Sequence, residues 1–151
     1  MLRPSRKTLY ALEAVLDIAY HAGGEPVQSR QITQRQGIPR RYLEQTLQQL
    51  VRGGILTGVR GPRGGYRLAR ERRRISLGEI VRLLEVEEAP ADDADAPASA
   101  LGQVVVRPLW DDLAEQWLAQ LDTISLDDLC RQAQSQGIEP DQPPPPVDFC
   151  I

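Results

Sequence analysis

The chain contains very little cysteine, histidine or phenylalanine: its 151 residues include two cysteines, one histidine and one phenylalanine. Two cysteines, Cys130 and Cys150, are too few for a disulfide framework, so we expect free thiols and leave any redox role open. No stretch reaches the roughly eighteen consecutive apolar residues of a membrane-spanning helix. Glu13 and Asp17 interrupt the apolar run that a signal peptide would need. These absences predict a cytoplasmic protein without a membrane segment.

Catalytic signatures are also missing. The sequence has no Cys and His in the context of a catalytic pair, no phosphate-binding loop ending in Lys-Ser or Lys-Thr, and no cluster of metal ligands. We therefore expect a protein that is not an enzyme and holds neither a metal nor a cofactor.

The overall charge of −3 conceals a strong asymmetry between the two halves of the chain. Residues 1–74 carry 15 Lys and Arg against 5 Asp and Glu, a net charge of +10, whereas residues 75–151 carry 3 against 16, a net charge of −13. A basic half beside an acidic half indicates a nucleic-acid-binding part and an acidic remainder.

The basic half begins with three predicted helices. Apolar residues recur at helical spacing from Ser5, a plausible N-cap, to about Ala22. A short helix over residues 30–36 follows Ser29, and a longer one runs from Pro39 to the glycines at 53–54. A short helix, a glycine-containing turn and a longer helix are typical of a helix-turn-helix unit.

A β-hairpin is predicted next. Apolar stretches at residues 55–59 and 66–68 flank a turn of glycine, proline and arginine. Arginine and glutamine pair with guanine and adenine edges, and a basic hairpin reaches phosphates or the minor groove. The candidate DNA-binding residues are Arg40, Arg41, Tyr42, Gln45, Arg60, Gly61, Pro62, Arg63 and Gly64.

We expect a mainly α fold with a small β-hairpin, a winged helix-turn-helix followed by a long dimerisation helix. The predicted parts are a DNA-binding domain at 1–85, an acidic flexible loop at 86–100, dimerisation helices at 101–136 and a Pro-rich flexible tail at 137–151. Capping boxes beginning at Ser76 and Ser125 are expected to open helices. The predicted dimerisation residues are Leu109, Trp110, Leu113, Trp117 and Leu121.

Several motifs together resemble one family. They are Ser5 to Leu12, Gln36-Gly37-Ile38, Tyr42-Leu43-Glu44-Gln45, Gly61-Pro62-Arg63-Gly64-Gly65-Tyr66 and Ser76 to Ile80. In this order and spacing they resemble the IscR/CymR-type (Rrf-two) bacterial winged-helix transcription regulators. The resemblance implies a homodimer that binds an inverted-repeat operator in double-stranded DNA, and we expect this regulator to be a repressor. The third helix would enter the major groove and the hairpin would touch the adjacent minor groove.

The chain departs from the iron–sulfur members of that family. Those members carry three cysteines before the long helix, whereas residues 85–107 contain none here. Cluster iron prefers thiolate ligands, so the resemblance is to the cluster-free branch.

The C-terminus offers another route of regulation. The last four residues, Asp148, Phe149, Cys150 and Ile151, resemble the Ile-terminated tails by which serine acetyltransferases enter cysteine synthase (O-acetylserine sulfhydrylase). CymR-type regulators act with that enzyme, so the hypothesis is a regulator of cysteine metabolism with cysteine synthase as partner.

Other interpretations stay open. The tail could be idle or folded back on the protein. The chain could regulate an enzyme with little DNA binding, bind RNA, or control redox stress, nitrosative stress or iron–sulfur assembly.

Overall fold

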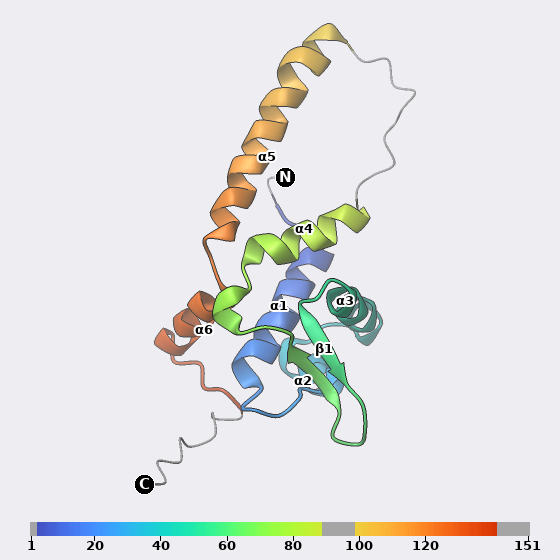
Figure 1. Ribbon diagram of the computed structural model, residues 1–151, viewed down its shortest axis with the longest axis vertical. Helices are drawn as coiled ribbons and strands as arrows, with labels where there is room; N and C mark the ends of the chain where they lie inside the picture. The colour runs from blue at the N-terminus through green and yellow to red at the C-terminus, as the bar shows by residue number, and fades with distance from the viewer. Residues whose placement is uncertain (1–2, 89–98, 142–151) are drawn as a thin grey trace.

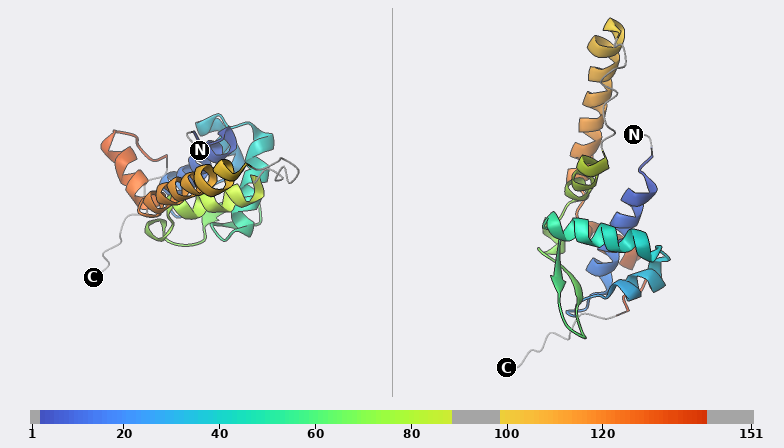
Figure 2. Two further views of the ribbon diagram at one scale, coloured as in Figure 1. Left: turned by 90° about the horizontal axis from the view of Figure 1, so that it is seen from above. Right: turned by 90° about the vertical axis from the view of Figure 1, so that its right-hand side faces the viewer.

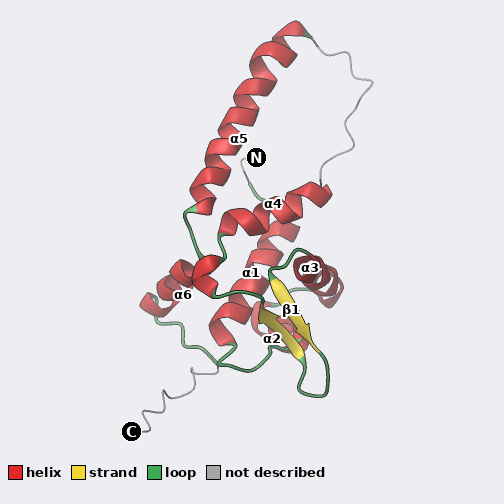
Figure 3. Ribbon diagram, in the orientation of Figure 1, coloured by secondary structure: helices red, strands yellow, loops and turns green. Residues whose placement is uncertain are grey.

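The computed structural model describes residues 3–88 and 99–141 of the chain. Helices dominate it, with one antiparallel hairpin, which confirms the predicted fold class (Figures 1 and 3). The elements are α1 (Arg6–His21), α2 (Ser29–Gln36), α3 (Arg40–Arg52), β1 (Leu56–Val59), β2 (Gly65–Leu68), η1 (Arg72–Arg74), α4 (Leu77–Glu88), η2 (Gly102–Val106), α5 (Arg107–Asp122) and α6 (Leu126–Ser135). None of the helices in the described part of the chain is both long and apolar enough to cross a membrane.

Helix α1 forms the centre of the core and contacts α2, α3, α4, α6 and β2. Its small and branched residues, such as Ala14 and Ile18, are fully buried and let the neighbouring helices approach closely. Ile32 of α2 and Leu47 of α3 pack into the same cluster. The helix-turn-helix is therefore fixed by its apolar side, which leaves its polar side exposed.

Helix caps follow the sequence signals closely. The Ser5 hydroxyl accepts a hydrogen bond from the Thr8 backbone N–H, and Ser76 and Ser125 form the two predicted capping boxes. Helix α2 begins at Ser29, one residue earlier than predicted, with Gln28 as its N-cap. The Gln28 backbone N–H donates to the Gln31 side chain at 2.9 Å.

The hairpin is the predicted wing. Val59 pairs with Gly65 at its tip end, and Val27 adds an isolated bridge to Tyr66 on the other side of β2. Gly64 has no room for a side chain, since a Cβ there would lie 2.2 Å from the Val59 carbonyl oxygen. Gly61 has φ of +112°, which few other residues adopt. The glycines therefore set the shape of the tip that carries the arginines.

The long helix begins with an irregular turn. Residues 102–106 form a π-helical turn, η2, in which the Arg107 N–H bonds to the Gly102 carbonyl. Pro108 then sits in the first turn of α5. Because proline has no N–H to donate, the wider turn accommodates it without ending the helix.

Helix α6, which lies within the segment 101–136 predicted for dimerisation, belongs to the body of the molecule. It packs against α1 and η1, and its Leu126 and Cys130 are buried. Burial is also the main cause that raises the pKa of the Cys130 thiol above its usual value. Cys130 is therefore a packing residue, and only α5 extends away from the body (Figures 1 and 2).

Candidate nucleic-acid interface

The exposed face of α3 carries the predicted base-reading residues. Arg40, Arg41, Glu44 and Gln45 line one shallow groove together with Gln48. Gln48 was missed by sequence reasoning, although helical spacing from Arg41 and Gln45 would have indicated it. The arrangement presents cationic and amide groups on one side of a helix, as base-edge recognition requires.

Two of the predicted residues have partners within the protein. The Tyr42 ring lies against Tyr10 of α1, with ring centroids 6.3 Å apart, and is about half exposed. Tyr42 thus lies on the flank of the groove and does not line it. Arg40 donates to Glu44 at 3.1 Å, and both side chains are exposed. Such a pair contributes little to stability, so Arg40 remains available for a phosphate.

The wing adds a second cationic element. Arg60 and Arg63 are exposed, and neither forms an ion pair with any residue that the structure describes. They flank Gly61 and Pro62 at the tip, and β1 packs against α3. The fold therefore brings the two groups of predicted DNA-binding residues, on α3 and on the wing, onto neighbouring elements.

A further polar groove lies between α2 and α3 and was not anticipated. Ser29, Arg30, Thr33 and Gln34 of α2 line it with Arg40 of α3. Ser29 begins α2, where backbone N–H groups point outward and favour an anion. This groove suits a DNA phosphate next to the recognition helix.

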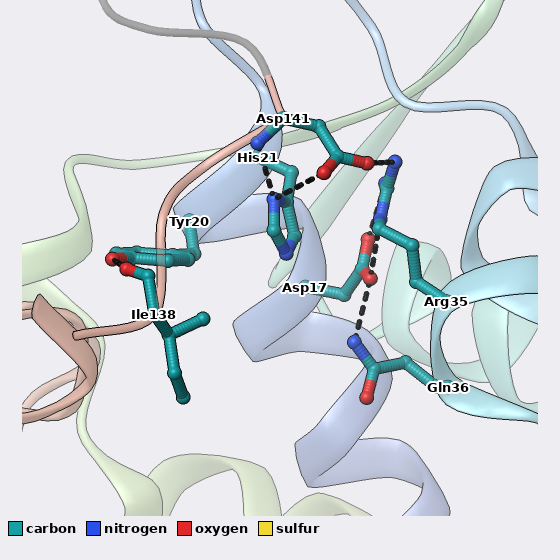
Figure 4. Close-up of polar contacts among 7 residues, drawn as sticks. All are labelled: Asp17, Tyr20, His21, Arg35, Gln36, Ile138 and Asp141. Carbon is teal, nitrogen blue, oxygen red and sulfur yellow. Dashed lines mark hydrogen bonds and ion pairs between the residues drawn. The ribbon is translucent and has the colours of Figure 1, made fainter. Parts of the chain in front are cut away.

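A buried ion pair holds α2 against α1 (Figure 4). The Arg35 guanidinium donates to both carboxylate oxygens of Asp17, at 2.7 and 2.9 Å, and Gln36 donates to Asp17 at 2.8 Å. The Asp17 side chain is completely buried. The hydrogen bonds from Arg35 to Asp17 raise the pKa of Arg35, and together with the Gln36 bond they fix the first helix of the helix-turn-helix.

The start of the predicted tail is attached to the same region. Gly137, with φ of +82°, turns the chain out of α6, and the Ile138 N–H bonds back to the Ala133 carbonyl. The chain then passes along α1, where Tyr20 donates to the Ile138 carbonyl (Figure 4). Ile138, within the predicted tail at 137–151, is thus bound to α1.

Asp141 completes this attachment. Its backbone N–H donates to the His21 ring at 2.9 Å, and its carboxylate accepts from Arg35 at 2.9 Å. Burial is the main cause that lowers the pKa of His21, so the ring is neutral and can accept. The histidine is structural. The last four residues, 148–151, and most of the acidic loop, 89–98, lie outside the described residues.

Comparison with known proteins identifies the family. A family model described as "Rrf2: Iron-dependent Transcriptional regulator" matches residues 4–132. The chain belongs to the Rrf2 family. The HTH-type transcriptional regulator IscR of Photobacterium profundum is 35% identical over 139 residues, which cover 91% of this chain and 80% of that protein.

Solved structures agree with this assignment. IscR of T. potens matches with a TM-score of 0.72 at 33% identity, over 89% of this chain and 90% of that one. CymR of B. subtilis, described as the global cysteine regulator, matches with a TM-score of 0.68 at 30% identity, over 87% and 98%. The protein is accordingly a winged-helix, DNA-binding transcription regulator of the Rrf2 family.

The residues of this Rrf2 protein do not fit an iron–sulfur cluster. Residues 85–107 contain no cysteine, and Cys130, one of only two in the chain, is buried in α6. Among the described residues, no group of three His, Cys, Asp or Glu side chains is placed to hold a metal ion. Cluster iron needs thiolates, so the iron dependence in the family description has no matching donor set here.

Proposed function

We propose that this Rrf2 protein is a homodimeric repressor that binds an inverted-repeat operator and controls genes of cysteine and sulfur metabolism. The observation that carries the proposal is the pairing of an exposed polar face on α3 with free arginines on the wing. In this proposal Arg41 and Gln45 read base edges, while Arg60 and Arg63 contact the minor groove or its phosphates. Gly61, Pro62 and Gly64 give the tip its shape.

The exposed face of α5 supports a dimer. Leu109, Trp110 and Leu113 are each about half exposed, and no residue of α5 is fully buried. Trp117 and Leu121 continue the stripe toward the body. A contiguous apolar face of this kind is expected to be covered, and a second copy of the same helix fits it by two-fold symmetry.

Two features favour cysteine metabolism as the regulated pathway. CymR of B. subtilis, the global cysteine regulator, shares the fold at 30% identity. The segment Asp148, Phe149, Cys150 and Ile151 also resembles the Ile-terminated tails that enter cysteine synthase. In this proposal, binding to cysteine synthase in the cytoplasm regulates the protein in place of an iron–sulfur cluster.

DNA binding is tested with an inverted repeat that the wild-type protein selects from random duplexes. We expect a strong preference over scrambled DNA and a steep fall of affinity with salt, because several phosphates are neutralised. Arg41→Ala is expected to cost about 1–3 kcal/mol on the selected sequence and to relax base preference. Arg63→Ala is expected to weaken binding to all sequences and to reduce the salt slope by about one.

Other outcomes would overturn the proposal. Equal affinity for selected and scrambled duplexes would contradict sequence-specific repression. Tighter binding to RNA of the same sequence would indicate an RNA-binding protein. An absence of nucleic-acid binding would favour a regulator that acts on an enzyme.

The tail is tested by deletion. Removal of Phe149 to Ile151 is expected to abolish binding to purified cysteine synthase and to leave the oligomeric state unchanged, because the deleted residues are remote in sequence from α5. Replacing Glu139, which is exposed and lies outside the deleted segment, by glutamine provides the control. Undiminished binding of the enzyme by the truncated chain would disprove the tail interaction.

A further inference from the structure

Helix α5 joins the body at its C-terminal end, and this corner of the molecule lies beside the start of α4. Apart from the π turn that continues it, its main contacts are with α4 (Figure 1). At its end the chain turns into α6 through residues 123–125. Any dimer built on α5 therefore receives its geometry from this corner.

The corner is joined to the start of α4 by backbone hydrogen bonds. The Leu77 N–H bonds to the Ile124 carbonyl at 2.9 Å, and the Leu126 N–H bonds to the Ile75 carbonyl at 3.0 Å. Between them Ser76 and Ser125 form an isolated antiparallel bridge. The two capping boxes thus lie on paired segments, and Ile75 and Leu126 are fully buried beneath them.

Side chains also link α4 to the end of α5, and we call this contact among Gly78, Arg82 and Asp122 the joint. Both terminal nitrogens of the Arg82 guanidinium, Nη1 and Nη2, donate to the Asp122 carboxylate, the second at 2.9 Å. Gly78 lies directly beneath this pair. A Cβ at position 78 would be 1.8 Å from an Asp122 carboxylate oxygen and 3.0 Å from the Asp122 backbone nitrogen. Only glycine allows α4 and α5 to approach this closely without displacing Asp122.

The same joint is continuous with the wing. Strand β2 leads through η1 into α4, and Arg70, just after β2, bonds to Glu79 of α4 at 2.8 Å. Residues 70 to 82 therefore connect the hairpin to the base of α5 along one short, anchored path. A change at the joint alters the direction of α5 relative to the wing.

The length of α5 amplifies such a change. Its 16 residues span about 24 Å at 1.5 Å per residue. A rotation of about 10° at the base moves the far end by about 4 Å, which exceeds the rise of about 3.4 Å between base pairs. A small change of angle at the joint is therefore enough to shift one DNA-binding unit of a dimer out of register with its half-site.

We propose that the joint formed by Gly78, Arg82 and Asp122 determines the spacing between operator half-sites that the dimer recognises. These are positioning residues that need not touch DNA. The inference rests on the proposed homodimer and adds the element that sets its geometry.

The test uses the full chain and the inverted repeat selected by the wild-type protein. The spacer between the half-sites is lengthened or shortened by one base pair, which changes separation by about 3.4 Å and rotation by about 34°. Wild-type affinity is expected to fall by about tenfold or more on either altered duplex. A duplex with one half-site measures the binding of a single DNA-binding unit.

Two variants probe the joint. Gly78→Ala displaces Asp122 although alanine favours helix more than glycine does, and Arg82→Gln removes the ion pair without adding bulk. We expect both to bind the single half-site as the wild type does but to lose the spacing preference to about threefold or less, or to prefer another spacer. Arg131→Gln, which breaks ion pairs with Asp127 and Asp128 inside α6, is expected to keep the wild-type preference.

The outcomes separate this inference from the proposed function. If the wild type selects no inverted repeat, the proposed dimeric repressor is wrong. If the wild type prefers one spacing and both joint variants show the same preference by the same factor, the role of the joint is disproved. Arg82→Gln keeps the test valid if Gly78→Ala does not fold.

Discussion

Replacing Leu113 by arginine is expected to convert the protein into a monomer and to lower operator affinity about 100-fold or more. Leu113 lies in the middle of the apolar stripe of α5 and is 48% exposed in the single chain. In a two-fold interface the substitution places two like charges in one desolvated patch, which is costly. Loss of the second DNA-binding unit then removes the gain from binding two linked half-sites.

The measurement is sedimentation or light scattering together with operator titration. Asp111→Arg is the matched control, because Asp111 is exposed and lies on the opposite side of the same helix. It changes the charge by more than Leu113→Arg does, yet it should leave the dimer intact. A Leu113→Arg protein that remains dimeric would show that α5 is not the interface.

Replacing Arg35 by methionine is expected to destabilise the protein by about 3–5 kcal/mol. The substitution leaves the buried carboxylate of Asp17 with Gln36 as its remaining side-chain partner, and an unpaired buried charge has a cost of this size. For a chain of this length the melting temperature should fall by on the order of 10 °C. Urea unfolding at one fixed protein concentration measures the effect.

Two comparisons make this result specific. Arg40→Met removes an exposed ion pair with Glu44 and should cost less than about 1 kcal/mol. The double variant Asp17→Asn with Arg35→Met removes both charges and should recover most of the lost stability. An Arg35→Met protein as stable as Arg40→Met would contradict the structural importance of the pair.

Local signals explain what the sequence predicted well. Ser5, Ser76 and Ser125 cap helices because each hydroxyl bonds to a backbone N–H three residues away. The wing follows similarly from glycines that permit a tight turn between two apolar stretches. In each case the partner is close in sequence, so residue type and spacing are sufficient.

The missed features depend on partners far away in the chain. Asp141 meets His21 and Arg35 across more than a hundred residues, and no pattern within residues 137–141 indicates that contact. Gly78 and Asp122 likewise approach only in the folded chain. Tyr42 is exposed as expected, but its contact with Tyr10 of α1 was not predicted. The roles of the exposed arginines in DNA binding stay predictions.

The attachment of residues 138–141 to α1 limits how far the residues after Asp141 can reach. Ten residues follow Asp141, so Ile151 can travel at most about 35 Å from the helix-turn-helix. A partner that bound residues 148–151, as proposed, would therefore be kept beside the DNA-binding body at an effective concentration in the millimolar range. A tail attached to the far end of α5 would instead hold such a partner away from DNA. The place of attachment would thus keep the proposed partner close to the operator.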